Sequence, residues 1–135
     1  MGTGECPCGT GKEYPRCCGQ LHEGGMPGSP EALMRSRYAA YALGLADYIL
    51  ETTHPAGPHW RADRAAWRRD VAGFCAETDF EGLTVHGFGM DPDGAQWVDF
   101  TARLGQSGRD ASFRERSRFR PHQGRWRYLE GSTPR

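Results

Sequence analysis

The chain has 135 residues, which is enough for one domain with a buried core and a small appendage. Its 17 basic and 17 acidic residues give a formal net charge of zero, so bulk charge gives no argument for a nucleic-acid or membrane partner. No apolar run approaches the roughly 18 residues of a membrane span, and residues 1–5 lack the basic start of a signal peptide. We therefore expect a cytoplasmic protein, in which disulfides are disfavoured.

Residues 1–23 contain a dense cysteine cluster, formed by Cys6, Cys8, Cys17 and Cys18. A disulfide between adjacent cysteines, or across Cys-x-Cys, is strained. Thioredoxin-like redox chemistry requires Cys-x-x-Cys at the start of a helix after a strand, and neither condition is met. A tetrahedral thiolate site fits better, because Gly9-Thr10-Gly11 lets the chain turn back and bring the two cysteine pairs together.

Coordination by four cysteine thiolates is typical of zinc or of an iron–sulfur cluster. Adjacent cysteines and glycine-rich turns in so short a segment favour zinc. Four protein ligands leave no open coordination position, so we expect a structural Zn²⁺ and not a catalytic one. This zinc knuckle would present three side chains to a partner, namely Lys12, Tyr14 and Arg16.

Residues 24–30, GGMPGSP, predict a linker that cannot continue regular structure. Ser29-Pro30-Glu31 predicts a helix start, with serine as N-cap and proline in the first turn. Apolar residues then recur at helical spacing, and Gly44 predicts a break followed by a short second helix to about residue 53. A third helix is expected from about residue 63 to residue 75.

After Phe80 the apolar period changes to two, which predicts antiparallel strands separated by turns. Acidic residues concentrate between residues 71 and 102 and eight arginines between residues 103 and 128, so we expect opposite charges to pair across the sheet. Residues 31–131 therefore predict an α+β domain, in which a helical hairpin and a third helix pack on an antiparallel sheet.

Two resemblances support these predictions. The segment CPCGTGKEYPRCCG resembles the SEC-C motif, the zinc-binding tail of the bacterial preprotein translocase ATPase SecA and of other proteins. The stretches LMRSRYAAY, DYILETTHP, ERSRF and GRWRYLEG resemble the YchJ-like family of small bacterial proteins. This family resemblance implies a middle domain similar to nuclear transport factor 2 (NTF2), with helices on a curved antiparallel sheet that together form a cone. Many members carry a second SEC-C motif after this domain, and this sequence ends without one, so we expect no function that needs two knuckles.

Domains that resemble this cone often hold a pocket between the sheet and the helices. Glu115 is in phase with the apolar residues of its predicted strand, so we expect it to point inward. A buried carboxylate needs a partner, and Arg35 and Arg37 in the first helix are the candidates, with Tyr38 beside them. Glu115 is then either half of a structural ion pair or a pocket acid or base with an arginine that holds an anionic ligand.

Two functions remain open. The preferred one is a zinc-binding adaptor, because the similar tail of SecA contacts the export chaperone SecB and the ribosome, which implies a protein partner. The alternative is a small-molecule-binding or enzymatic cone with its pocket near Glu115, Arg35 and Arg37. No nucleophile elbow, P-loop or dinucleotide fingerprint occurs, so a binding role is favoured over an enzymatic one. Related cones often dimerise through the sheet, so the resemblance also suggests a homodimer. A filled core with Glu115 bonded to an arginine would favour the adaptor, and a deep apolar cavity would favour the alternative.

Overall fold

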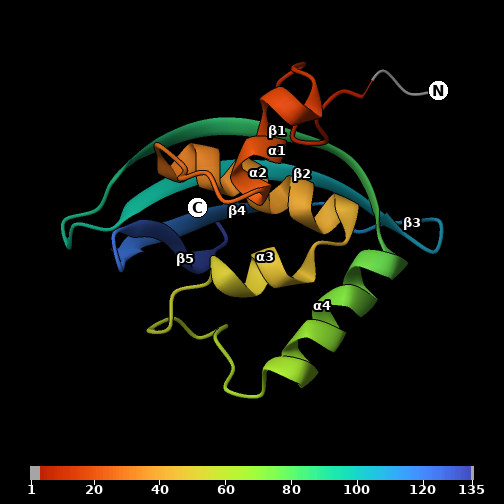
Figure 1. Ribbon diagram of the computed structural model, residues 1–135. Coiled ribbons are helices and arrows are strands. Elements are labelled where there is room, and N and C mark those ends of the chain that lie inside the picture. The colour runs from red at the N-terminus through yellow and green to blue at the C-terminus, as the bar shows by residue number, and fades with distance from the viewer. Residues whose placement is uncertain (1–3, 135) are drawn as a thin grey trace.

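The computed structural model describes residues 4–134, so residues 1–3 of the predicted knuckle segment lie outside the described residues. Helices come first in the chain and strands follow (Figure 1). The helical elements are the 3₁₀ helix η1 (Tyr14–Arg16) and the α-helices α1 (Cys18–His22), α2 (Pro30–Leu43), α3 (Ala46–Glu51) and α4 (Arg64–Glu77). The strands are β1 (Asp79–Met90), β2 (Gln96–Gln106), β3 (Arg109–Asp110), β4 (Phe113–His122) and β5 (Arg125–Ser132).

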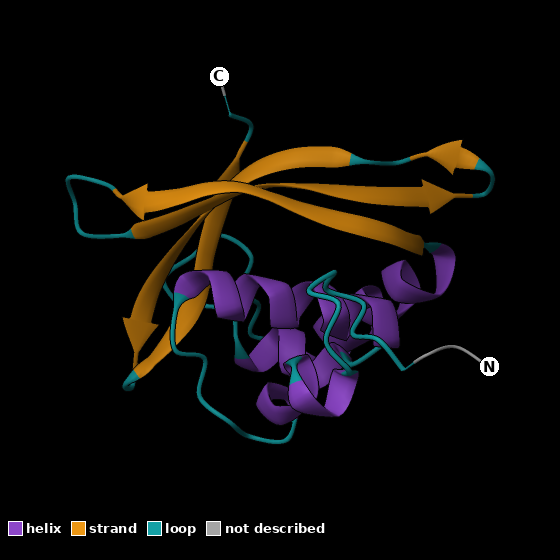
Figure 2. Cartoon of the chain, turned by 90° about the horizontal axis from the view of Figure 1, so that it is seen from above, coloured by secondary structure: helices purple, strands orange, loops and turns teal. Residues whose placement is uncertain are grey.

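The strands form one antiparallel sheet in the order β1-β2-β4-β5, and the short β3 pairs with β2. All helices lie on the same face of the sheet, and the sheet curves around them (Figure 2). The pairing of β1 with β2 shifts register twice, and that of β4 with β5 shifts once. Such irregularities bend and twist strands, which accounts for the curvature. The predicted α+β architecture is therefore confirmed.

The helix boundaries follow local sequence signals. The Ser29 hydroxyl accepts a hydrogen bond from the Ala32 amide at 3.1 Å, as an N-cap does, and Pro30 occupies the first turn. Gly44 ends α2 in the left-handed conformation with φ of 74°, which costs a glycine little. Asp63 caps α4 in the same way as Ser29 caps α2. The predicted break at Gly44 and the three predicted domain helices are confirmed, although α4 extends to Glu77.

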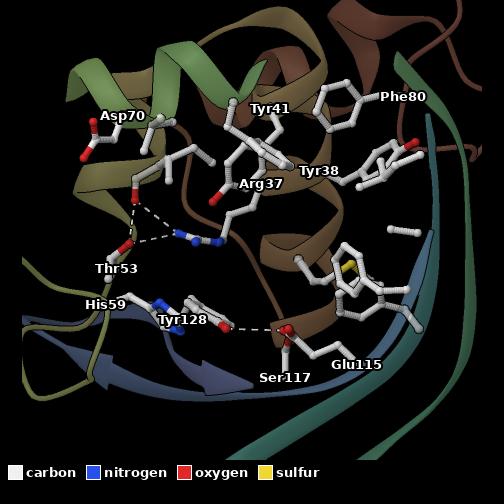
Figure 3. Close-up of a pocket in the computed structure, with 18 of the residues that line it drawn as sticks. Arg37, Tyr38, Tyr41, Thr53, His59, Asp70, Phe80, Glu115, Ser117 and Tyr128 are labelled. Carbon is white, nitrogen blue, oxygen red and sulfur yellow. Dashed lines mark hydrogen bonds between the residues drawn. The ribbon is translucent and has the colours of Figure 1, made fainter. Parts of the chain in front are cut away.

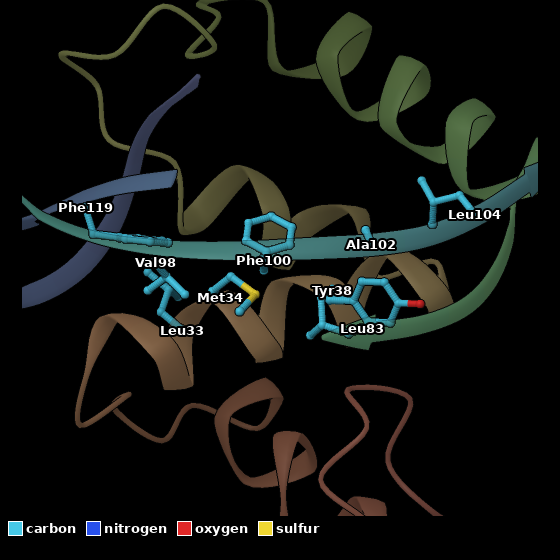
Figure 4. Packing of buried hydrophobic residues seen from close by; sticks show 9 residues of the cluster. All are labelled: Leu33, Met34, Tyr38, Leu83, Val98, Phe100, Ala102, Leu104 and Phe119. Atoms are coloured by element: carbon cyan, nitrogen blue, oxygen red, sulfur yellow. The ribbon is translucent and has the colours of Figure 1, made fainter. Parts of the chain in front are cut away.

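The core lies between α2 and the concave face of the sheet (Figure 4). Its members are Leu33, Met34, Tyr38, Leu83, Val98, Phe100, Ala102, Leu104 and Phe119. The residues from β2 alternate along the strand, because successive side chains point to opposite faces. The period-two pattern therefore identified the buried face of β2 correctly.

The other face of the sheet carries the charged residues. Arg114 bonds Asp99 at 2.8 Å across β2 and β4, and the Arg116 guanidinium lies over the Trp97 ring, 3.7 Å from its centroid. Arg118 forms ion pairs with three acidic side chains, Asp91, Asp93 and Glu130. The expected pairing of the acidic and the arginine-rich strands is thus confirmed. No helix within residues 4–134 is long and apolar enough to cross a membrane.

Candidate metal centre and domain cavity

The four clustered cysteines converge on one point. Their Sγ atoms all lie within 4.8 Å of one another, and those of Cys8 and Cys17 are 3.5 Å apart. A tetrahedral zinc site with Zn–S bonds near 2.3 Å requires sulfurs about 3.8 Å apart, so the donor set has the size and chemistry of such a site. Cys6, Cys8 and Cys18 are buried and Cys17 is half-buried, and all five cysteines are free thiols.

A small hairpin brings the first cysteine pair into place. The Cys6 amide donates to the Lys12 carbonyl at 2.8 Å, and Gly9 and Gly11 both adopt positive φ between them. The Thr10 hydroxyl lies 3.2 Å from the Cys17 sulfur, so it links the hairpin to the second pair. Cys17 precedes α1 and Cys18 begins it. The Gly9-Thr10-Gly11 turn therefore reverses the chain as its glycines predicted.

The clustered thiols differ in pKa. A hydrogen bond with the Cys18 side chain lowers the pKa of Cys8 to about 4. The same hydrogen bond and burial raise the pKa of Cys18, and burial raises the pKa of Cys6. One thiolate is thus stabilised at the expense of its neighbours. A cation is needed to hold all four as thiolates, and a metal ion bound between them would supply that charge.

The metal centre packs directly on helix α2. The Tyr14 hydroxyl hydrogen-bonds His22 Nδ1 at 2.6 Å, and His22 Nε2 lies 2.8 Å from the Ser36 carbonyl oxygen. Because a carbonyl only accepts, Nε2 carries the proton and the tyrosine donates to Nδ1. Burial lowers the pKa of His22, which agrees with a neutral ring. The knuckle is therefore fixed to the domain by a chain of hydrogen bonds in addition to the covalent connection between α1 and α2.

Arg35 belongs to this contact and not to the pocket in which the sequence analysis placed it. Its Nη1 donates to the Cys8 carbonyl at 2.8 Å, and its Nε bonds Glu31 at 3.0 Å. Residues two apart on a helix are separated by about 200° around its axis, so Arg35 and Arg37 cannot face the same cavity. The prediction that Arg35 lines the pocket is wrong for this reason.

The three residues predicted to meet a partner have different exposures. Lys12 and Arg16 are exposed beside the metal centre. Tyr14 is half-buried, because its hydroxyl is bonded to His22 and its ring packs against the cysteine cluster. Of these three residues, only the two basic ones are therefore open to a partner.

A cavity of about 480 Å³ lies between the sheet and helices α2, α3 and α4 (Figure 3). Its walls are mainly apolar and include Trp67, Phe74, Phe80, Phe100 and Phe113. Arg37, Tyr38 and Glu115, three of the residues predicted for a pocket, are part of the lining. The exposed Arg61–Asp70 ion pair, with an N–O distance of 2.6 Å, lies at its edge.

Arg37 extends from α2 across the end of α3. Its Nη1 donates to the Ile49 carbonyl at 3.1 Å and to the hydroxyls of Thr52 at 2.7 Å and Thr53 at 3.3 Å. Its guanidinium lies over the ring of Tyr128, 4.6 Å from the centroid. Arg37 is only 8% exposed, yet within residues 4–134 it forms no ion pair with a carboxylate.

Glu115 points into the same cavity and, within residues 4–134, also lacks an arginine partner. Its Oε2 accepts hydrogen bonds from the Ser117 hydroxyl and, at 3.3 Å, from the Tyr128 hydroxyl. Burial raises the pKa of Tyr128, and the charge of Glu115 acts in the same direction. The tyrosine therefore stays protonated and can remain a donor. The expected Glu–Arg pair is absent among the described residues. Instead, the Tyr128 hydroxyl bonds Glu115, and the Tyr128 ring lies against the Arg37 guanidinium.

Three residues important for these sites escaped the sequence analysis, namely His22, Tyr41 and Tyr128. His22 lies one helical turn after Cys18, but that spacing is too common to signal a contact. Tyr128 could have been found, since Trp126 and Tyr128 continue a period-two pattern and Tyr128 pairs with Phe119 in the sheet.

Comparisons with known proteins agree with this architecture. A family model described as the middle NTF2-like domain of YchJ matches residues 29–131. A SEC-C motif containing protein from Rhodopseudomonas palustris, known from a solution structure, is 41% identical to this chain, with a TM-score of 0.79. That match covers 96% of this chain and 98% of the other. A crystal structure of a SEC-C motif containing protein from Psychrobacter arcticus has 22% identity and a TM-score of 0.72, over 96% of this chain and 82% of that one. This second likeness shows the fold alone.

The family match begins at the capping serine of α2 and reaches into the last strand, so it includes every element around the cavity. The cysteine cluster precedes it, at the N-terminus. The chain therefore belongs to the YchJ-like family, with an NTF2-like middle domain preceded by a SEC-C motif.

Proposed function

We propose that this protein binds a small, largely apolar molecule in the cavity of its NTF2-like domain, and that a structural zinc ion stabilises the attached knuckle. The observation that carries the proposal is the cavity itself, about 480 Å³ with mainly apolar walls. Volumes of this size are typical of small-molecule sites. Glu115 is bonded to a serine and a tyrosine inside it, and among the described residues no arginine pairs with it to close the core.

Zinc is the ion that the donor set favours. Four cysteine sulfurs form a closed tetrahedral set without a position for substrate, which is the pattern of structural zinc. The expected result is one zinc per chain in protein purified without chelators, and its loss in Cys17→Ser/Cys18→Ser. Elemental analysis that finds iron, or no metal, in the native protein would refute this assignment.

Ligand binding is tested with a neutral fluorescent reporter, N-phenyl-1-naphthylamine. We expect saturable binding to the wild-type protein at one site per chain. Val71 lines the cavity from α4 and is half-buried, so Val71→Trp should fill the entrance and weaken binding at least about tenfold. Arg69→Trp, on the exposed part of the same helix, is the matched control and should bind as the wild type does. Equal binding by both variants would exclude the cavity as the site.

A second candidate function is the adaptor role, in which the knuckle contacts a protein partner. It is supported by Lys12 and Arg16, which are exposed beside the cysteine cluster and free to contact a partner, whereas Tyr14 is half-buried. Lys12→Ala/Arg16→Ala keeps all four sulfurs, so it separates the loss of the surface from the loss of the fold. If this double variant captures the same partners as the wild type, in equal amounts, the knuckle surface is not the contact.

A further inference from the structure

The chemical class of the ligand follows from the charges inside the cavity, and this step rests on the proposed function above. We propose that the ligand is a small aromatic or aliphatic acid whose anionic group, a carboxylate in the simplest case, binds Arg37 at the α3 end of the cavity. Its apolar body would then lie against the aromatic walls.

The first argument is the state of Arg37. A buried charge is stable only when it is paired or fully hydrogen-bonded. Arg37 is only 8% exposed to solvent. Its three hydrogen bonds to the end of α3 and the following turn are accepted by neutral oxygens. All three come from Nη1, and the Tyr41 side chain also hydrogen-bonds the guanidinium, so the contacts that hold this charge within residues 4–134 come from neutral groups. A carboxylate in the cavity would supply both the missing charge and two oxygens in the geometry that a guanidinium prefers.

The second argument is the pair of tyrosines around the guanidinium. Tyr128 lies under it, and Tyr41 lies on its other side in the cavity wall (Figure 3). Burial raises the pKa of both phenols, although the charge of Arg37 acts in the opposite direction. Both hydroxyls therefore remain donors. The Tyr128 hydroxyl is used by Glu115, whereas the Tyr41 hydroxyl can donate to an anion bound at Arg37.

The third argument is the position of Glu115. Its carboxylate lies on the far side of the Tyr128 hydroxyl from Arg37, and it would repel a ligand anion placed nearby. The anionic group must therefore bind at Arg37, and the walls formed by Phe74, Phe80 and Phe100 surround the remaining space. This arrangement fits a molecule with one charged end and an apolar body.

The experiment uses two probes of equal shape and different charge, 4-phenylbutyrate and 4-phenyl-1-butanol, which compete with N-phenyl-1-naphthylamine on the zinc-loaded full chain. A charge-assisted contact with Arg37 should let the carboxylate displace the reporter at a concentration at least about tenfold lower than the alcohol. Equal displacement by the two probes would overturn the inference and leave the cavity as a neutral binding site. If the reporter itself does not bind, the proposed ligand-binding function is refuted, and with it the inference about the charge of the ligand.

Three variants test whether Arg37 is the residue that binds the carboxylate. Arg37→Met should abolish the preference for the carboxylate while the alcohol still competes. Arg61→Gln, at the exposed edge of the cavity, is the matched control and should retain the preference for the carboxylate. If Arg61→Gln loses this preference, the assignment of the anion site to Arg37 is overturned. Arg37→Met can also fail to fold, because Arg37 fixes the end of α3, and Glu115→Gln then decides. Removal of that negative charge should increase the preference, and an unchanged or reduced preference would overturn the inference.

Discussion

Arg35 provides the sharpest test of how the metal centre is held on the domain. Arg35→Met keeps the apolar stem and removes the guanidinium that donates to the Cys8 carbonyl at 2.8 Å. A hydrogen bond from a charged donor contributes about 1.5–3 kcal/mol, and Cys8 is fully buried, so no water replaces the donor. The i,i+4 pair with Glu31 adds only about 0.3–0.5 kcal/mol. We expect the free energy of unfolding to fall by about 2–3 kcal/mol.

The assay is urea unfolding of the zinc-loaded protein, together with the rate at which a chelator removes the metal. Glu31→Gln is the matched control, because it breaks the ion pair and keeps the bond to Cys8, so it should cost about 0.5 kcal/mol or less. Arg35→Met should also release the metal faster while its cavity still binds the neutral reporter normally. The reasoning is refuted if the two variants are equally stable, or if Arg35→Met loses reporter binding and retains its metal.

Three further predictions concern stability. Phe119 is fully buried, so Phe119→Ala should cost about 3–5 kcal/mol in urea unfolding, and a cost below 1 kcal/mol would contradict the packing of the core. A methyl group at Gly57 would clash with the Leu129 carbonyl oxygen, so Gly57→Ala should destabilise by about 1–3 kcal/mol or more, whereas Gly73→Ala, with open space on α4, should be neutral or stabilising. Burial lowers the pKa of His22, so the unfolded chain binds this proton more readily than the folded protein. The contribution of neutral His22 to the free energy of unfolding is therefore fully present above about pH 6.5. It is lost as the pH falls below this value, by at most about 1.4 kcal/mol per pH unit. The difference in unfolding free energy between wild type and His22→Gln should therefore shrink from about pH 7.5 to 5.5, and a constant difference would show that folding does not lower the pKa of His22.

The sequence was most informative where one local rule decides the outcome. Capping by Ser29 and the positive φ of Gly44 are properties of a few neighbouring residues, so the ends of α2 could be predicted without the rest of the molecule. The inward face of β2 follows from the alternation of side chains, which any buried strand must obey. The cysteine cluster also needs only a short hairpin to converge, since its two pairs are nine residues apart from Cys8 to Cys17.

The parts that could not be predicted depend on how distant elements meet. Arg35 and Arg37 are equally plausible partners for Glu115 by composition, and only the rotation of α2 about its axis decides which one faces the sheet. The bond of Tyr128 to Glu115 requires the register of β4 against β5, which shifts next to Phe119. The volume of the cavity depends on how far α4 stands from the sheet. No pattern within α4 encodes that distance.

Helix α2 connects the two sites, because consecutive residues on it serve different neighbours. Arg35 donates to the carbonyl of Cys8, the Ser36 carbonyl accepts from His22 of the knuckle, and Arg37 reaches the end of α3 and the cavity. The Ser36 hydroxyl also bonds Tyr48 of α3 at 2.7 Å, so the knuckle, α2 and α3 share one hydrogen-bonded contact. A helix packed at this density moves as a unit, and a shift on its knuckle side must move Arg37 as well. A metal ion at the four cysteines would therefore influence the proposed ligand site through α2, because it would hold the knuckle against that helix.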